Sequence, residues 1–81
     1  MKYALLERFS KQLESFSESV QGKFWKQLNY LLRDLRHPSL RSKKYDESRG
    51  IWQARVDKST RFYFLIDGDK YILLEIKKHP E

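Results

Sequence analysis

The apolar residues of this chain change their spacing near residue 50, and that change limits the folds open to it. Before residue 50, apolar side chains recur every three or four positions, which is the spacing of one helix face. After it, they alternate with polar residues or form short runs rich in aromatic and β-branched side chains, as strands do. A chain of 81 residues has room for one domain, in which helices must cover a face of the sheet. We therefore predict that residues 1–81 form a single α+β domain of two layers.

Two helices are predicted in the first half, joined by a serine-rich turn at residues 15–19 that favours a helix start. Their apolar stripes consist of Leu5, Phe9, Leu13 and Phe16, and of Val20, Phe24, Leu28, Leu31 and Leu35. Pro38 ends the second helix, because the residue before a proline is pushed out of helical geometry. The two helices should form a helical hairpin.

Three strands of an antiparallel meander are predicted after residue 50. They cover residues 52–57, 61–66 and 71–76, with a hairpin turn at 67–69, and a short strand at Lys2–Leu5 can precede them. Residues 39–50 lack periodicity and are expected to form an irregular arm. The predicted fold is thus an N-terminal helical hairpin packed on an antiparallel sheet of three to four strands.

The first two predicted strands set the position of two arginines. If Trp52, Ala54 and Phe62 face the helices, the strand pairing places Arg55 opposite Arg61 on the open face of the sheet. A slip of one residue would bury Arg61 without a partner, which is costly. Like charges directly opposite each other destabilise a sheet, so the pair calls for a bridging anion or a nearby carboxylate.

The third strand can supply that carboxylate and a histidine. If Ile72, Leu74 and Ile76 face the core, then Glu75, Lys77 and His79 join the arginines, and Glu75 can neutralise part of the charge on Arg61. Tyr71 and Leu73 would fill the core nearly as well, so both registers stay open. Arginines and a histidine on one face suit phosphate binding and acid–base work on a phosphodiester.

The positive charge is concentrated in one third of the chain. Of a net charge of +6, the largest share falls in residues 36–61, which contain eight basic and only three acidic side chains. The basic residues are interleaved with Tyr45 and Trp52. This pattern is typical of proteins that bind polyanions. A solvated face that keeps a small protein in solution would give the same composition.

Several other classes of function are excluded or disfavoured. The chain has no cysteine, which excludes disulfides, thiolate zinc sites and cysteine nucleophiles. The histidines and carboxylates show no metal-ligand spacing, and three glycines form no phosphate-binding loop. No metal or other cofactor is therefore expected. Because no apolar run approaches about 18 residues and no signal peptide is visible, we expect a cytoplasmic domain.

Simpler roles exist for most of these side chains. Arg55 and Arg61 can be surface arginines that stack on neighbouring rings, and His79 can belong to an inert chain end. His37 before Pro38 is expected to help end a helix. Lys77 and Lys78 can protect an edge strand from aggregation.

Three segments and a closing strand resemble the RelE/ParE toxin superfamily. The segments are His37-Pro38-Ser39-Leu40-Arg41-Ser42-Lys43-Lys44, Gly50-Ile51-Trp52-Gln53-Ala54-Arg55-Val56 and Arg61-Phe62-Tyr63-Phe64, and the closing strand runs into His79. The resemblance covers residues 20–79 and implies two helices on an antiparallel sheet of about four strands. It also implies the toxin of a type II toxin–antitoxin system, with a cognate antitoxin protein as its partner.

For RelE-like members, the resemblance implies a ribosome-dependent endoribonuclease that cuts mRNA without a metal. The RNA 2′-hydroxyl attacks the adjacent phosphate and leaves a cyclic phosphate and a free 5′-hydroxyl. Arg55, Arg61 and His79 then match the family's catalytic positions. Basic residues that would hold mRNA or rRNA are Arg41, Lys43, Lys44, Lys58, Lys77 and Lys78.

The alternative is a protein of this fold that does not cut RNA. It would poison DNA gyrase as ParE-like members do, or only bind an antitoxin. Many family nucleases carry an aromatic residue just after the histidine, whereas this chain continues from His79 with Pro80 and Glu81. The two strand arginines and His79 favour the nuclease, and the missing aromatic residue favours the alternative.

Overall fold

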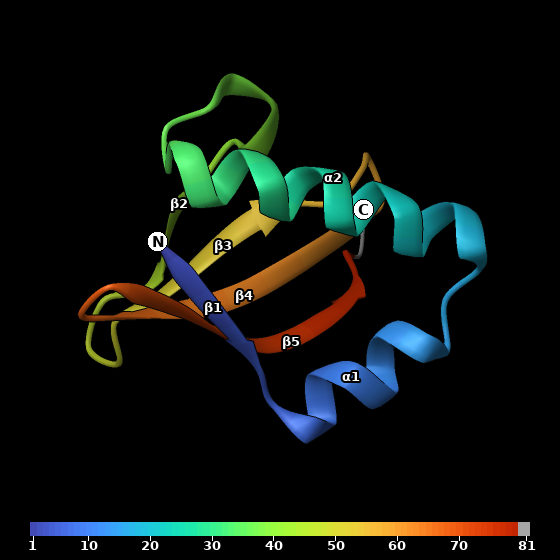
Figure 1. Cartoon of the computed structure of the whole chain (residues 1–81), viewed down its shortest axis with the longest axis horizontal. Coiled ribbons are helices and arrows are strands. Elements are labelled where there is room, and N and C mark those ends of the chain that lie inside the picture. The colour runs from blue at the N-terminus through green and yellow to red at the C-terminus, as the bar shows by residue number, and fades with distance from the viewer. Residues whose placement is uncertain (80–81) are drawn as a thin grey trace.

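Two helices lie on one face of a five-stranded sheet in the computed structural model, which describes residues 1–79 (Figure 1). The elements in chain order are β1 (Lys2–Leu5), α1 (Glu7–Glu14), α2 (Glu18–Arg33), the short 3-10 helix η1 (Pro38–Leu40), β2 (Lys43–Asp46), β3 (Ile51–Arg55), β4 (Thr60–Asp67) and β5 (Lys70–Lys78). The α+β class and the two layers are as predicted. Among the described residues, no helix is both long and apolar enough to cross a membrane.

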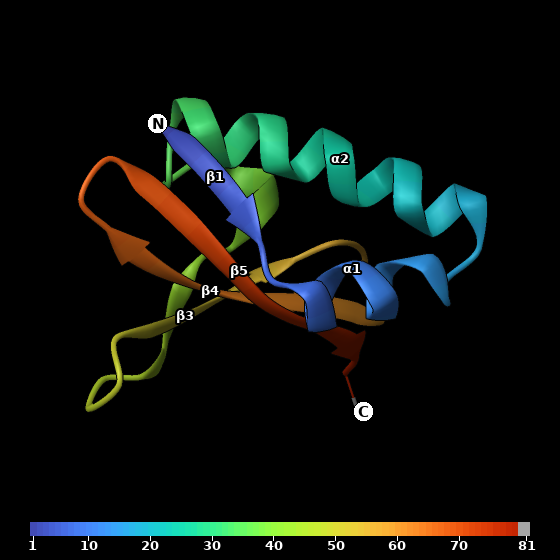
Figure 2. The ribbon, with the colours of Figure 1, turned by 60° about the horizontal axis from the view of Figure 1, so that its bottom comes forward.

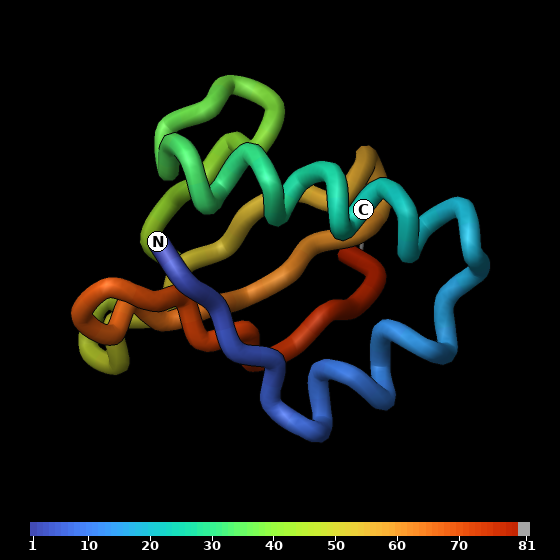
Figure 3. Tube along the Cα trace, viewed as in Figure 1, coloured from blue at the N-terminus to red at the C-terminus, as the bar shows by residue number. Residues whose placement is uncertain are grey.

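The sheet is larger than predicted and is mixed rather than antiparallel. Its strand order is β1-β5-β4-β3-β2, and β1 pairs with β5 in parallel, from Lys2 opposite Lys70 to Leu5 opposite Leu73. In Figure 3 the blue start of the chain can be followed beside the red segment. The β4–β5 hairpin leaves the outer edge of β5 free, and β1 covers it, with Ala4 and Leu5 half-buried.

The fifth strand comes from the segment predicted to be an irregular arm. Leu40 is fully buried and anchors η1, and the chain then pairs with β3 as β2. Four residues, three of them charged, give no apolar alternation, so backbone pairing rather than side-chain burial defines this strand. Its register shifts between Lys44 and Asp46, which marks a bulge at Tyr45.

The helical hairpin has the predicted stripes but ends earlier. Ser17 caps α2, and its hydroxyl accepts a hydrogen bond from the backbone N–H of Val20 at 3.3 Å. The helix ends at Arg33, before the Pro38 signal, although Leu35 still packs on the core. As Figure 2 shows, α1 and α2 diverge from their short connection, and both border the sheet.

Aromatic rings join the two layers. Phe24 of α2 lies 5.1 Å from the ring centroid of Phe9 in α1 and 5.3 Å from that of Phe62 in β4. All three side chains are fully buried. The contact between Phe24 and Phe62 is edge-to-face at 89°, an arrangement that adds roughly 0.5–1.5 kcal/mol to the free energy gained from burial.

The predicted register of β3 and β4 is confirmed. Ala54 pairs with Phe62 on the helix-covered face, and Arg55 pairs with Arg61. The hairpin turn predicted between β4 and β5 is confirmed as well, and Gly68 in it has a positive φ of 59°.

The register of β5 contains a bulge that combines the two registers left open. Near its end, Ile76 is buried opposite Phe62, but the pairing shifts between Tyr63 and Phe64. Between Lys70 and the shift, Tyr71 and Leu73 are buried, so of the two open registers the one with Ile72 and Leu74 in the core does not hold for this half of the strand. One extra residue in β5 turns the alternation over, and this allows each half of the strand to bury its larger side chains.

A buried glutamine connects α2 with the two segments that lead to the open face. The Gln27 side-chain amide donates hydrogen bonds to the backbone carbonyls of Ser39 at 3.0 Å and Arg55 at 2.9 Å. Its oxygen accepts a hydrogen bond from the Ser39 hydroxyl at 3.0 Å. The end of β3 and the start of the segment that becomes β2 are thereby held to the same helix.

Replacing a core leucine should destabilise the domain. Leu28 is 2% exposed, and we expect Leu28→Ala to lower the free energy of unfolding by about 2–5 kcal/mol, because it removes buried methyl groups and leaves a cavity. Denaturant unfolding would measure the loss. Exposed Lys26 on the same helix provides the control, and Lys26→Ala should stay within about 0.5 kcal/mol of wild type. Equal stability of both variants would contradict this description of the core.

Gln27→Leu should also destabilise the domain, although it makes the buried side chain more apolar. The change removes three hydrogen bonds, and we expect a loss of roughly 1–3 kcal/mol in the free energy of unfolding. Amide hydrogen exchange should become faster at the end of β3 and around η1. Asn29→Leu, at an exposed position of α2, should change neither measurement. Unchanged exchange in Gln27→Leu would mean that the glutamine does not hold these segments.

Candidate functional site

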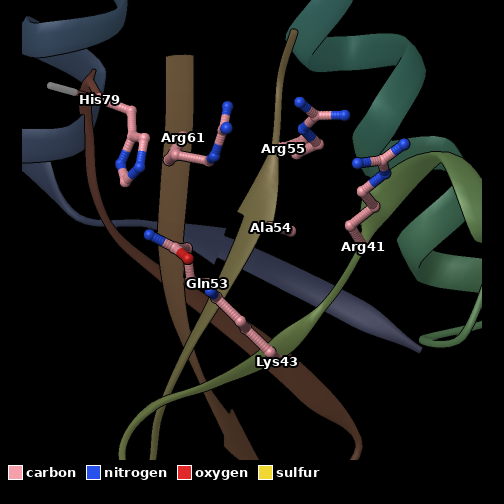
Figure 4. A pocket seen from close by; sticks show the side chains of 7 residues that line it. All are labelled: Arg41, Lys43, Gln53, Ala54, Arg55, Arg61 and His79. Carbon is pink, nitrogen blue, oxygen red and sulfur yellow. The ribbon is translucent and has the colours of Figure 1, made fainter. Parts of the chain in front are cut away.

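A cationic pocket of about 320 Å³ opens on the face of the sheet that the helices leave uncovered. The residues that line it are Arg41, Lys43, Gln53, Ala54, Arg55, Arg61 and His79. In Figure 4, His79, Arg61, Arg55 and Arg41 follow one another across the strands from β5 to the segment before β2. No acidic side chain of residues 1–79 is part of the lining. The pocket therefore suits an anion.

The turn between β3 and β4 holds Arg61 in place. One terminal nitrogen, Nη1, donates hydrogen bonds to the backbone carbonyls of Asp57 at 2.6 Å, Lys58 at 3.2 Å and Thr60 at 3.1 Å. A guanidinium has five N–H groups, so the rest of the fork can still bind a ligand. Arg61 is therefore presented to the pocket in a fixed orientation.

Asp57 orders this turn. The backbone N–H of Ser59 donates to its carboxylate at 2.9 Å, and Lys23 of α2 lies 3.7 Å from it. Desolvation raises the pKa of Asp57, but hydrogen bonds from Ser59 and Thr60 together with the charge of Lys23 outweigh it, so the pKa is lowered. The charged carboxylate thus connects the turn's backbone, through Ser59, with Lys23 of α2.

Arg55 has a different environment. Desolvation, followed by repulsion from Arg41 and Arg61, lowers the pKa of its guanidinium. An arginine nevertheless stays charged at neutral pH. Within residues 1–79, no carboxylate forms a salt bridge with Arg55 or Arg61. Repulsion from Arg41 and Arg61 thus outweighs the attraction that nearby Asp57 exerts on Arg55, and an anion in the pocket would relieve it.

The prediction that Glu75 would neutralise Arg61 is wrong. The residue opposite Arg61 is Lys77, and Glu75 lies opposite Tyr63. The Glu75 carboxylate instead forms salt bridges with Arg8 of α1 at 3.2 Å and with Lys77 at 3.7 Å. Its charge is thus taken up beside the pocket rather than in it.

His79 follows the last strand and is attached to the same turn as Arg61. Its backbone N–H donates to the carbonyl of Ser59 at 2.7 Å, while its side chain is exposed and reaches the pocket (Figure 4). Pro80 and Glu81, the residues at which the family's aromatic position was sought, lie outside the described part of the chain.

Arg41 reaches the pocket from an unusual backbone conformation. Its φ is 47°, in the left-handed region that costs a non-glycine residue roughly 1–2 kcal/mol. The residue ends η1 and turns the chain into β2. Buried Leu40 before it and the pairing of β2 after it keep the backbone in this conformation.

The basic residues predicted to bind RNA do not all gather at the pocket. Arg41 and Lys43 line it, whereas Lys44 lies on the other face of the sheet, with its ammonium 5.1 Å from the ring centroid of Trp52. Lys58 belongs to the β3–β4 turn that binds Arg61. Lys77 is on the open face, 5.2 Å from the ring centroid of Tyr63, and Lys78 pairs with Thr60 at the end of the sheet.

Gln53 is a pocket residue that the sequence prediction missed. It lies two positions before Arg55 on the same strand face, and this alternation was enough to identify it. Its side-chain amide donates a hydrogen bond to the Tyr63 hydroxyl at 3.1 Å. Gln53 therefore adds an uncharged polar group to the pocket and connects it with the ring of Tyr63.

His37 has a structural role, but not the predicted one, because α2 already ends at Arg33 and His37 begins η1. Its ring stacks on Tyr30 with centroids 3.9 Å apart, and its Nδ1 accepts a hydrogen bond from the backbone N–H of Ser39 at 3.2 Å. Among the described residues, no three histidine or acidic side chains come together as a metal site would require.

Comparison by sequence finds no relative, since neither a protein-family model nor a curated protein matches the chain. Comparison by structure finds several. A YoeB/ParE toxin from Agrobacterium tumefaciens has a TM-score of 0.82 at 14% identity, over 99% of this chain and 100% of that one. The heterotetrameric YoeB–YefM toxin–antitoxin complex from Staphylococcus aureus gives 0.80 at 13%, over 99% and 98%. The archaeal RelE–RelB complex from Pyrococcus horikoshii OT3 gives 0.80 at 13%, over 95% and 92%.

These likenesses extend over almost the whole chain, and the identities are too low to show more than the fold. The two helices packed on a sheet agree with the resemblance that the sequence segments carry, although the sheet has five strands rather than about four. The chain has the fold of the RelE/ParE toxins.

Proposed function

We propose that the chain is the toxin of a type II toxin–antitoxin pair and acts as a ribosome-dependent endoribonuclease. The observation that carries the proposal is the pocket, which brings Arg55, Arg61 and His79 together on one face and has no acidic side chain of residues 1–79 in its lining. Two guanidinium groups, of which Arg61 is held by hydrogen bonds, and a histidine form a set that suits the cleavage of a phosphodiester.

The proposed reaction is an internal transfer within the RNA. The 2′-oxygen forms a bond to the adjacent phosphorus while the bond from phosphorus to the 5′-oxygen breaks, which yields a cyclic phosphate and a free 5′-hydroxyl. Negative charge builds up on the phosphorane oxygens, and Arg61 and Arg55 would stabilise it. One proton leaves the 2′-hydroxyl and one reaches the 5′-oxygen; His79 would carry one of these transfers and water the other.

Arg61 is suited to its part because its orientation is fixed before any ligand binds. Three backbone carbonyls hold Nη1, so the guanidinium need not be ordered during the reaction. Preorganised charge of this kind is more effective than a mobile side chain, which must first lose its freedom. The backbone bond of His79 to Ser59 fixes the two groups to one turn.

The proposed partners are mRNA, ribosomal RNA and an antitoxin. Arg41 and Lys43 in the pocket and Lys77 on the same open face would bind the phosphate backbone in a salt-dependent manner. Lys44, Lys58 and Lys78 would add to the attraction from other parts of the surface. Several of the similar structures are complexes with an antitoxin, YefM or RelB. For this chain we propose an antitoxin with an acidic segment that covers the cationic pocket.

Removing the imidazole should stop cleavage without unfolding the protein. We expect His79→Ala to reduce cleavage of a translated reporter mRNA by about 10²–10⁴-fold, the usual contribution of a general acid or base. Primer extension would locate and quantify the cuts within codons at the ribosomal A site. The unfolding midpoint should not change, because the side chain is exposed and its backbone hydrogen bond survives in alanine.

His37→Ala is the matched control, since His37 stacks on Tyr30 away from the pocket lining. It should cut at the wild-type sites. Cleavage by His79→Ala at the wild-type rate would remove His79 from proton transfer. If the folded wild-type protein makes no cuts, the nuclease proposal fails, and a gyrase supercoiling assay would test the binding alternative.

Arg61→Ala should lower the cleavage rate by about 10²–10³-fold, because it removes charge stabilisation of the transition state. Single-turnover cleavage on programmed ribosomes would separate this loss from weaker binding. Arg33→Ala, at an exposed position of α2, controls for the loss of one positive charge. Full activity in Arg61→Ala would exclude the arginine from the mechanism.

A further inference from the structure

An exposed aromatic side chain stands beside the cationic pocket and has no assigned role. Tyr45, at the bulge of edge strand β2, is 55% exposed and is the most exposed of the large apolar or aromatic side chains within residues 1–79. Its ring contacts Tyr63 in a T-shaped arrangement, with centroids 4.8 Å apart and planes at 64°. Burying such a ring only in part forgoes stabilisation that the fold could have gained.

The contact with Tyr63 connects Tyr45 to the pocket. The Tyr63 hydroxyl accepts the hydrogen bond from Gln53, which is one of the pocket residues. Gln53 pairs with Tyr63 on one side and with Lys43 on the other. Tyr45 follows Lys43 by two residues, a distance of about 7 Å along an extended strand. The exposed ring is therefore a near neighbour of the pocket.

Tyr63, the side chain on which Tyr45 packs, is held in place by its neighbours. Tyr63 is 4% exposed, and the Lys77 ammonium lies 5.2 Å from its ring centroid. A salt bridge with Glu75 restrains Lys77 in turn. A tyrosine side chain has only two rotatable angles, and here one part of it packs on a fixed neighbour, so it loses little entropy when a flat ligand stacks on it.

We propose that Tyr45 is a stacking site for a nucleobase of single-stranded RNA, one whose neighbouring phosphate occupies the cationic pocket. The inference rests on the proposed function, because it takes the phosphate in the pocket to be that of an RNA chain. Cationic grooves with exposed aromatic rings are the usual means of binding single strands. The surroundings favour RNA over an apolar protein segment, since Gln53 and Lys43, which connect Tyr45 and Tyr63 with the pocket, are polar and positively charged.

The test is a titration with a short RNA that cannot react. A six-nucleotide single strand with 2′-methoxy groups lacks the attacking hydroxyl, and its match is the same sugar–phosphate chain without bases. Proton NMR of the tyrosine ring resonances at up to millimolar RNA would detect stacking as upfield shifts on Tyr45. Titration of wild type, Tyr45→Ala and Tyr45→Phe with both oligomers would give the affinities.

We expect Tyr45→Ala to weaken binding of the base-containing strand by roughly 5- to 150-fold, which corresponds to the usual contribution of one stacked base. Binding of the strand without bases should not change, and Tyr45→Phe should bind like wild type because it retains the ring. Tyr3, 44% exposed on β1 at the opposite edge of the sheet, provides the matched control, and Tyr3→Ala should have no effect.

Three results would overturn the proposal: no ring shift at millimolar RNA, unchanged affinity in Tyr45→Ala, or an equal loss for both oligomers. A shift of the Tyr45 resonances with an acidic antitoxin peptide but not with RNA would assign the ring to a protein partner instead. The proposed function fails separately. If RNA binding depends on Tyr45 but no mRNA is cut on ribosomes, the stacking proposal stands and the nuclease proposal fails. If mRNA is cut but Tyr45→Ala changes neither cleavage nor RNA binding, the nuclease proposal stands and the stacking proposal fails.

Discussion

The pairing of Ala54 with Phe62 is the constraint from which the candidate site follows. Both side chains are buried beneath the helices, and Phe62 also meets Phe24 of α2. A strand cannot slip by one residue without turning its core face towards water, so this pair excludes the neighbouring registers. Once the pair is in place, Arg55 and Arg61 must lie opposite each other on the open face. The packing of the core thus imposes two adjacent positive charges on the sheet surface.

The fold restrains those charges instead of neutralising them. Gln27 holds the end of β3 from inside the core, the β3–β4 turn binds Arg61, and Arg41 is kept in a left-handed conformation. The carboxylate of Glu75 in β5 is engaged with Arg8 and Lys77. Repulsion and an unfavourable backbone conformation both cost stability, and local costs of this kind are concentrated at functional sites. Their offset comes from the hydrophobic core and from any anion that enters the pocket.

Much of this arrangement could be predicted from the sequence because it depends on alternation. The helices, the face of Arg55 and Arg61 and the turn at Gly68 all follow from local spacing or from a glycine. The bulge in β5 could not be predicted, because Tyr71, Ile72, Leu73 and Leu74 are all suited to a core and only contacts with β4 and the helices select among them. Strand β2 was missed for the opposite reason. Its side chains are mostly charged, and its pairing with β3 rests on backbone groups that are alike in every sequence.

The pocket combines residues from segments with a clear alternation and residues from segments without one. This explains which pocket residues could be predicted from the sequence. Arg55 and Arg61 belong to strands with a clear alternation and His79 directly follows the last strand, whereas Arg41 and Lys43 come from the segment that looked irregular. The uncharged Gln53 escaped attention although it shares a strand face with Arg55. A search for charge alone therefore finds the groups that would bind a phosphate but overlooks the polar and aromatic surface beside them. On the proposed function, that neighbouring surface is where a phosphate that belongs to RNA would differ from a free one, because only RNA brings a base to the ring of Tyr45.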